Sequence, residues 1–184
     1  MTTNYGLNQL RDEIHQNAVD HGWWDEERSF AEIIALIHSE LSEALEEYRE
    51  GRPLVYVDDF TLEKRITDIS QFGDRKPEGI AFELADTVIR ILDYCGHEKL
   101  NIEEGLNMRR AGNDTYALPE LVAECHYLIS IIYLKVEPCL LCFAECISLI
   151  DYWCDENGID LAEAIHIKHE YNKTRPHRHG GKRV

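Results

Sequence analysis

The chain has 184 residues, of which 44% are hydrophobic, and its formal net charge is −16. This length supports one domain with a full core, and this apolar content excludes a disordered chain. The sequence shows neither an apolar run of the roughly 20 residues that cross a membrane nor a signal-peptide core. The acidic surface disfavours nucleic acid and anionic lipid as partners. We therefore expect a soluble, cytoplasmic protein that binds any anionic ligand through a cation or a local basic patch.

Helical spacing of apolar residues begins close to the N-terminus. Residues 4–21 predict a first helix. Ser29 and Glu32 have the spacing of a capping box, and they open a second helix that ends at Gly51. The periodicity is then lost over residues 52–76, which we interpret as an irregular insertion.

Within the insertion, the apolar run at residues 54–57 is typical of a short strand. Helical spacing returns at residues 77–94, with Pro77 in a first turn that tolerates proline. The remaining predicted elements are a short helix over 102–110, three helices over 119–135, 138–157 and 161–171, and a basic tail over 173–184. The fold class that follows is an all-α helical bundle.

Two parts of the chain resemble each other. Residues 30–38 align with residues 118–126, which lie 88 positions later in the sequence. This indicates an internal tandem duplication that forms a pseudo-dimer within one domain. One copy would span 29–113 and contain the insertion, and a degenerate second copy would span 118–175.

Four acidic residues stand out on the second and third predicted helices. Glu40 and Glu43 are three residues apart, as are Glu83 and Asp86, so each pair projects from one helix face. If the two pairs face each other, the four carboxylates repel unless a cation neutralises them. Oxygen ligands suit a hard cation, Mg²⁺ or Mn²⁺. The alternative is that these acids lie on solvated faces, as most glutamates do.

The predicted duplication favours the metal interpretation. In its register the four acids correspond to apolar residues of the second copy. Positions that are apolar in the same architecture are expected to face inward, and inward-facing acids require a cation. The corresponding residues are Leu128, Ile131, Leu141 and Ala144.

The order of these motifs resembles the MazG-like, all-α nucleoside triphosphate pyrophosphohydrolases, a family related to the dimeric dUTPases and dCTP pyrophosphatases. The match is carried by residues 39–43 (SELSE), 83–86 (ELAD) and 168–175 (KHEYNKTR). The chain departs from the family at Ser39, which stands where the first Glu of an EExxE motif is expected. Glu46 or Glu47, one turn further on, would have to replace it.

The resemblance implies hydrolysis of an NTP or dNTP to a nucleoside monophosphate and pyrophosphate. Mg²⁺, or alternatively Mn²⁺, would bind Glu40, Glu43, Glu83 and Asp86. Lys168, Asn172 and Arg175 would contact the phosphates. Trp23 would stack on the base, although a packing role in the core is the commoner one for such a residue. His166, His169, His177 and His179 are expected at the surface or beside the phosphates.

Two other functions remain open at this stage. A di-metal carboxylate oxidase would need Glu-x-x-His pairs facing the bundle interior, and Glu163 with His166 is a single pair outside the acidic motifs. A non-catalytic helical module that binds a nucleotide or a partner would use the acids differently. The sequence leaves open a homodimer and does not identify the base or sugar.

Overall fold

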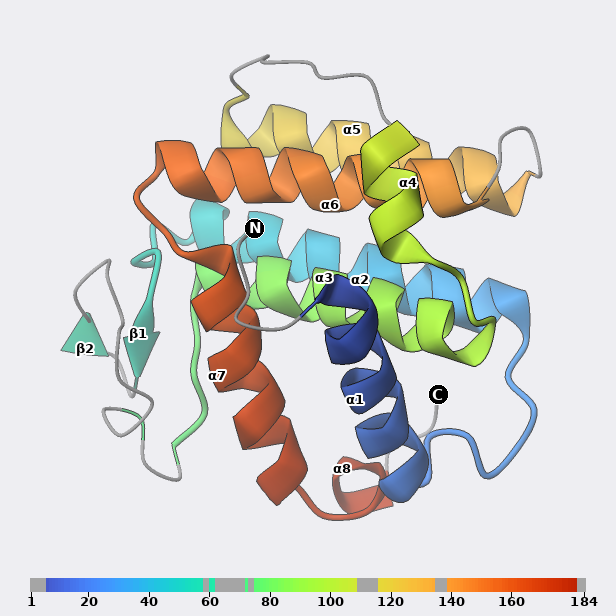
Figure 1. The fold of residues 1–184 in the computed structure, drawn as a ribbon. Helices are drawn as coiled ribbons and strands as arrows, with labels where there is room; N and C mark the ends of the chain where they lie inside the picture. Colours follow the sequence, from blue (N-terminus) through green and yellow to red (C-terminus); the bar gives the residue numbers. More distant parts are fainter. Residues whose placement is uncertain are drawn as a thin grey trace.

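The computed structural model describes residues 6–57, 60–61, 72, 75–108, 116–134 and 139–181. In this part of the chain the protein is all-α, with one two-stranded antiparallel sheet at its side (Figure 1). None of the described helices is both long enough and apolar enough to cross a membrane. The elements are α1 (Leu7–Asp20), α2 (Phe30–Arg49), β1 (Tyr56–Val57), β2 (Phe60–Thr61), α3 (Ile80–His97), α4 (Ile102–Met108), α5 (Leu118–Tyr133), α6 (Cys139–Glu156), α7 (Leu161–Thr174) and α8 (Arg178–Gly181).

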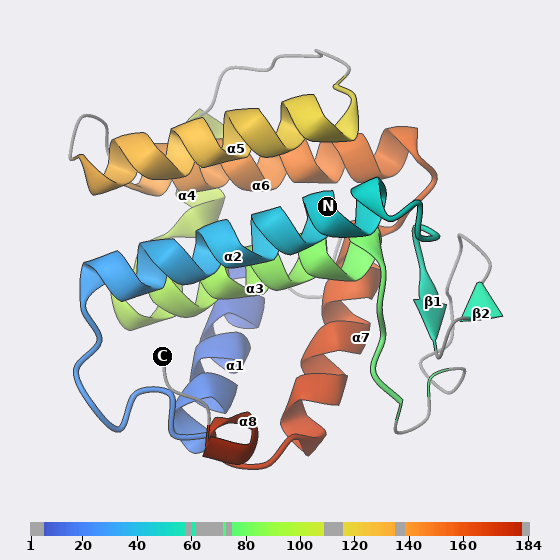
Figure 2. The same ribbon diagram turned by 180° about the vertical axis from the view of Figure 1, so that it is seen from behind.

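The helices lie in three levels, which Figures 1 and 2 show from opposite sides. α5 and α6 form one level, α2 and α3 the middle one, and α1 and α7 cross beneath with α8 between their ends. α3 packs against α1, α2, α6 and α7, so most of its residues are buried. Among its polar side chains, those of Glu83, Thr87 and Asp93 are buried.

The predicted capping box opens α2. The Ser29 hydroxyl accepts a hydrogen bond from the Glu32 amide at 3.2 Å, and the Glu32 carboxylate accepts one from the Ser29 amide at 2.7 Å. Such a box satisfies two amides that would otherwise lack partners. It fixes the start of the helix that carries Glu40 and Glu43.

α3 begins at Ile80, three residues after the predicted start at Pro77. Glu78 instead forms a bridge with Tyr56, and Gly79 has a φ of 109°. A side chain at residue 79 would lie 2.7 Å from the carbonyl oxygen of Leu54. Residues 77–79 are therefore an extended connection to β1, whose strand character was predicted. Most of the rest of the insertion (58–59, 62–71 and 73–74) lies outside the described residues.

The C-terminal segment is not a simple tail in its described part. α7 continues to Thr174, and α8 follows. The Arg178 amide and guanidinium donate hydrogen bonds to the carbonyls of His21 and Gly22, at 2.9 and 3.0 Å. The prediction of a tail from Lys173 is thus wrong up to Gly181, because these contacts attach the segment to the α1–α2 connection.

The third helix of each predicted copy packs on the other copy. α4 follows α3 in sequence but packs against α6, and α7 follows α6 but packs against α3. Their starts are alike, because Asn101 and Asp160 each accept a hydrogen bond from the amide three residues later. The two predicted copies are therefore not separate units, because each packs its third helix against the other.

Contacts between α2 and α5 follow the predicted register. His38 and His126, which the prediction makes equivalent, lie side by side with their rings tilted by 33° and their Nδ1 atoms 2.7 Å apart. Ser42 and Ser130 are also equivalent, and each hydroxyl donates to the carbonyl four residues earlier. Self-contact of equivalent residues is expected near a two-fold axis. These features support the duplication, which stays a prediction.

Candidate metal and phosphate site

A large cavity lies between the middle level of the bundle and the helices beneath it. Its volume is about 400 Å³, within the usual range for small-molecule sites. It is lined from five helices and from the connection after α1. The lining residues are Ile14, Asn17, Ala18, His21, Trp23, Leu36, Ser39, Glu40, Glu43, Lys76, Glu83, Asp86, Ile89, Arg90, Asp93, Lys168, His169, Asn172, Arg175 and His179.

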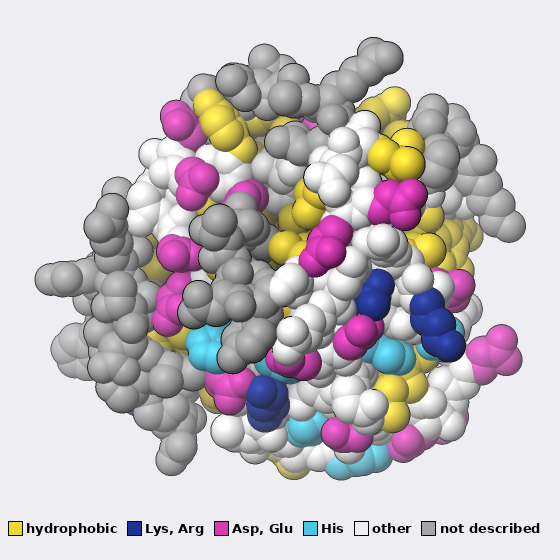
Figure 3. Space-filling model, in the orientation of Figure 1, with side chains coloured by type: hydrophobic (Ala, Val, Ile, Leu, Met, Phe, Trp, Pro, Cys, Tyr) yellow, Lys and Arg dark blue, Asp and Glu magenta, His cyan; other side chains and the backbone are white. Residues whose placement is uncertain are grey.

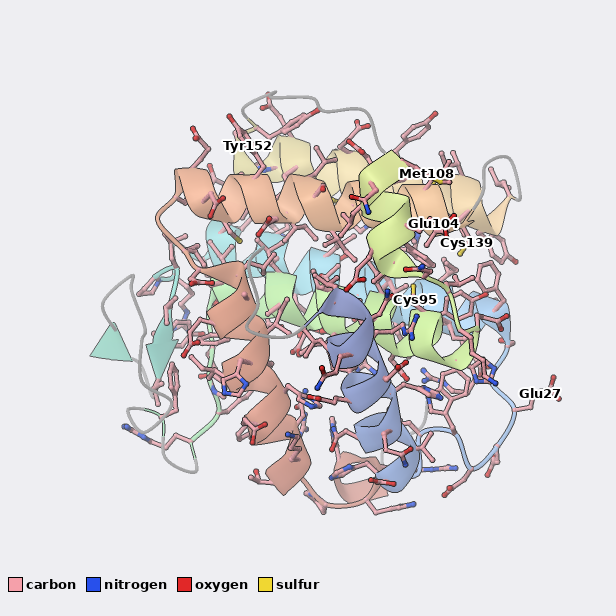
Figure 4. All side chains as sticks on the ribbon, viewed as in Figure 1. Glu27, Cys95, Glu104, Met108, Cys139 and Tyr152 are labelled. Carbon is pink, nitrogen blue, oxygen red and sulfur yellow. The ribbon has the colours of Figure 1, made fainter. Side chains whose placement is uncertain are left out.

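Three carboxylates meet on one wall of this cavity. Glu40 and Glu43 from α2 and Glu83 from α3 each offer an oxygen, and these atoms all lie within 4.8 Å of one another. Glu40 and Glu83 are only 8% and 4% exposed, whereas Glu43 is exposed. Other acids, such as Glu27 in Figure 4, point away into solvent. We call Glu40, Glu43 and Glu83 the carboxylate trio.

Asp86, the fourth predicted ligand, pairs with a lysine. Its Oδ2 lies 2.8 Å from Nζ of Lys168, which comes from α7 and is 2% exposed. The same ammonium group is 3.9 Å from Oε1 of Glu83 and donates to the carbonyl of Pro77 at 3.3 Å. Lys168 was predicted to contact substrate phosphate, and the structure places it between α7 and the acids of α3.

Arg90 was not among the predicted site residues. Its Nε donates to Oε1 of Glu40 at 3.0 Å, and its guanidinium lies 5.9 Å from the ring centre of Trp23. The spacing carried a signal, because Arg90 is four residues after Asp86 and seven after Glu83 on the same helix. The acidic wall therefore includes two built-in cations, Arg90 and Lys168.

Burial dominates the electrostatics of the trio. It raises the pKa of Glu83 to about 7, against the opposing effect of Lys168. The pKa of Glu40 is also raised, first by burial and then by Asp86. Burial alone would lower the pKa of Lys168, but Asp86 and Glu83 outweigh it and leave this pKa raised. Lys168 is therefore charged, and the acids around it lack full neutralisation.

The facing wall comes mainly from α7. Asn172 and Arg175 line it, one and two turns after Lys168. Oδ1 of Asn172 and Nε2 of His169 are buried without a hydrogen-bond partner. Such groups are costly unless a ligand or water satisfies them. Within the described residues, these atoms mark where a polar ligand fits.

The four C-terminal histidines differ in position. His169 is 2% exposed and lines the cavity, which excludes the surface position but leaves the predicted position beside the phosphates open. Burial lowers its pKa to about 4. His166 is exposed, and His177 is exposed beside Asp25. His179 lines the cavity. Histidine side chains lie over α1 and α7 on the face shown in Figure 3.

Trp23 both packs and lines the cavity. It is 9% exposed, and the His179 ring meets it edge-on with the ring centres 4.9 Å apart. Trp24 is not among the lining residues. Its indole N–H donates to Asp93 at 2.9 Å and its ring stacks on His97. Trp23 is therefore the tryptophan that a ligand in the cavity would contact.

The replacement for the missing family Glu is not evident. Ser39 lines the cavity, and its hydroxyl lies 3.3 Å from Oε1 of Glu43. Glu47 is not among the lining residues, and its Oε1 accepts a hydrogen bond from the Tyr56 hydroxyl at 3.0 Å. Glu46 pairs with Arg49 at the surface. The Glu47 side chain therefore joins α2 to β1, and its position lends no support to a role in the cavity.

Comparison of this chain with family models, with curated proteins and with solved structures gives no match. The functional argument consequently rests on the residues of the site. The trio offers oxygen donors only, on two rigid helices, which is the donor set that Mg²⁺ and Mn²⁺ prefer. The residues present fit a hard divalent cation.

Proposed function

We propose that this chain is a Mg²⁺-dependent nucleoside triphosphate pyrophosphohydrolase of the MazG-like kind. It would cleave an NTP or dNTP between the α and β phosphates to give the monophosphate and pyrophosphate. The observation that carries the proposal is the carboxylate trio on the wall of a cavity that Lys168, Asn172 and Arg175 also line. This pairing of acids with cations suits a metal–polyphosphate complex.

The carboxylates of the trio and Asp86 would hold Mg²⁺. The ion, when bound, neutralises charge on phosphate oxygens and lowers the pKa of an attacking water. Mn²⁺ would serve in its place. The buried positions of Glu40 and Glu83 fix their oxygens and limit competing water, so the ligands need little rearrangement.

The remaining lining residues would bind and orient the nucleotide. Arg175 can hold a phosphate through two parallel hydrogen bonds, and Asn172 offers an acceptor and two donors. Trp23 presents an aromatic ring at the edge of the cavity, which suits stacking on a nucleobase. Arg90 lies between Trp23 and Glu40, so it can bridge the base and phosphate ends of the ligand.

The direct test is a panel of NTPs and dNTPs with Mg²⁺, with the monophosphate and pyrophosphate measured separately. Turnover that needs Mg²⁺ and yields pyrophosphate supports the proposal. Release of inorganic phosphate instead would indicate cleavage at the γ phosphate and count against it. Absence of turnover of every nucleotide would reject it.

A second candidate is a non-catalytic module that binds nucleotides. It is favoured by the two ion pairs, because Lys168 and Arg90 already neutralise part of the acidic wall. The same panel separates the two: nucleotide binding without product formation would favour the module. A di-metal oxidase is less well supported, because the group of described residues suited to a metal contains no histidine.

A further inference from the structure

One acid of the site is set apart from the other three. The trio oxygens lie within 4.8 Å of one another, whereas Asp86 is engaged by Lys168 at 2.8 Å. The lysine reaches Asp86 from a different helix, and its side chain is almost fully enclosed. A close ion pair in such a place is strong, since little water screens it.

A metal ion and the Lys168 ammonium group cannot share Asp86 easily. Both are positive, and Nζ of Lys168 already lies 2.8 Å from Oδ2 of Asp86, so a divalent cation on this carboxylate would be repelled at short distance. Lys168 can leave only if another anion receives it, because an unpaired buried ammonium is costly. A group near Lys168 shows where that anion fits: His169 is 2% exposed and lines the same cavity, yet its Nε2 has no hydrogen-bond partner and can donate to an anion when it carries the ring proton.

We propose that Lys168 keeps Asp86 out of the metal site until a polyphosphate takes over its ammonium group. The inference rests on the proposed function. The trio would bind a divalent cation without substrate, and Asp86 would become a metal ligand only when substrate draws Lys168 away. Metal binding and polyphosphate binding would then strengthen each other, and by linkage the effect would be equal in both directions.

Arg90 pairs with Glu40, but it competes with a metal ion less strictly than Lys168 does. Its side chain is 24% exposed and its contact to Glu40 is a hydrogen bond at the cavity wall. Arg90 can move aside into the cavity, so it does not impose the same all-or-none choice. We call the release of Asp86 by Lys168 on polyphosphate binding the gate. It is therefore specific to the Lys168–Asp86 pair.

The test measures Mn²⁺ binding by equilibrium dialysis and by thermal shift, without nucleotide. Lys168→Met should bind a further ion per chain, or bind Mn²⁺ about tenfold more tightly, because Asp86 is released. This gain should vanish in the double variant Lys168→Met with Asp86→Asn. A gain that persists in the double variant would reflect general electrostatics and overturn the gate.

Lys173→Met is the matched control, since it removes a lysine from the same helix that pairs with Glu170 instead. It should leave Mn²⁺ binding unchanged. If Lys168→Met does not fold, the wild-type protein and Asp86→Asn give the answer. Inorganic tripolyphosphate should increase Mn²⁺ binding by the wild type, after subtraction of its own chelation, more than by Asp86→Asn. Equal increases would overturn the gate.

The outcomes also separate this inference from the proposed function. A wild-type protein that binds no Mn²⁺ with or without tripolyphosphate would remove the metal site, and the gate with it. A protein that binds Mn²⁺ with the same stoichiometry and affinity in wild type and Lys168→Met would keep the metal site and reject only the gate.

Discussion

The two helix pairs of the bundle place opposite chemistry at matching positions. Glu40 on α2 is 8% exposed and Leu128, its predicted equivalent on α5, is 9% exposed. Ala144 on α6 packs beneath Gly105 of α4, whereas its equivalent on α3, Asp86, pairs with Lys168. A leucine gains free energy from burial, and a glutamate loses it. The buried acids of α2 and α3 therefore lower the stability of the fold, whereas the apolar residues at the corresponding positions of α5 and α6 raise it. Such a loss of stability is expected for residues whose role is to bind a ligand.

The largest expected effect comes from removing an acid from the α2–α3 pair. Glu43→Ala should lower kcat/KM for Mg²⁺-dependent pyrophosphate release by about 10³-fold, since a metal ligand is lost. Because Glu43 is exposed, the free energy of unfolding should change little. Glu46→Ala, on the same helix but paired with Arg49 at the surface, is the control. Full activity in Glu43→Ala would remove the metal site from this pair of helices.

The converse change puts an acid into the apolar pair. Leu128→Glu should lower the free energy of unfolding by about 3–4 kcal/mol in urea titration, because the new carboxylate is buried without a partner. Tyr127→Glu, at a residue that is 59% exposed, should be nearly neutral. If Leu128→Glu lowers the free energy of unfolding no more than Tyr127→Glu does, Leu128 is not a buried apolar equivalent of Glu40.

Replacing Glu83 by glutamine, which has the same shape and no charge, measures how much this buried acid lowers the free energy of unfolding. Because the pKa of Glu83 is raised from 4.5 to about 7, the folded protein binds this proton more tightly than the unfolded chain does. Its contribution to stability is complete below about pH 4.5 and is lost as the pH rises through 7. In chelator, Glu83→Gln should match the wild type near pH 4.5 and exceed it by about 3 kcal/mol above pH 7. A difference independent of pH would show that the pKa of Glu83 is the same in the folded and unfolded states.

The smallest effect concerns Arg175, which follows α7 and lines the cavity. Arg175→Ala should raise KM for the nucleotide about tenfold, with little change in unfolding temperature, because a phosphate contact is lost. Lys173→Ala, which breaks the exposed pair with Glu170, should leave KM unchanged. Unaltered kinetics in Arg175→Ala would restrict the site to residues before it on α7.

Sequence patterns located the helices and the acids but not the partners of the acids. Apolar periodicity and the capping box at Ser29 predicted the helices because they are local signals. Spacing placed Glu40 with Glu43 and Glu83 with Asp86 on shared faces. It could not show that Lys168 reaches Asp86 or that Arg90 reaches Glu40, since such pairing depends on how helices cross. The burial of His169 was missed for the same reason.

The start of α3 shows a different limit. A proline is compatible with a first helical turn and equally with an extended segment, so Pro77 did not decide the boundary. The start of α3 is set by the bridge between Tyr56 and Glu78, which keeps residues 77–79 out of the helix. Local sequence carries no information about such a bridge.

The exchange of third helices has a consequence for how the protein is made. α7 is synthesised after α2, α3, α5 and α6, yet it supplies the cation that neutralises Asp86 on α3. A growing chain that has completed α2 and α3 therefore carries clustered acids before their counter-charge exists. The bundle cannot close pair by pair in the order of synthesis. Two fragments cut between α4 and α5 should each fold poorly, and should recover structure and the complete site only when mixed.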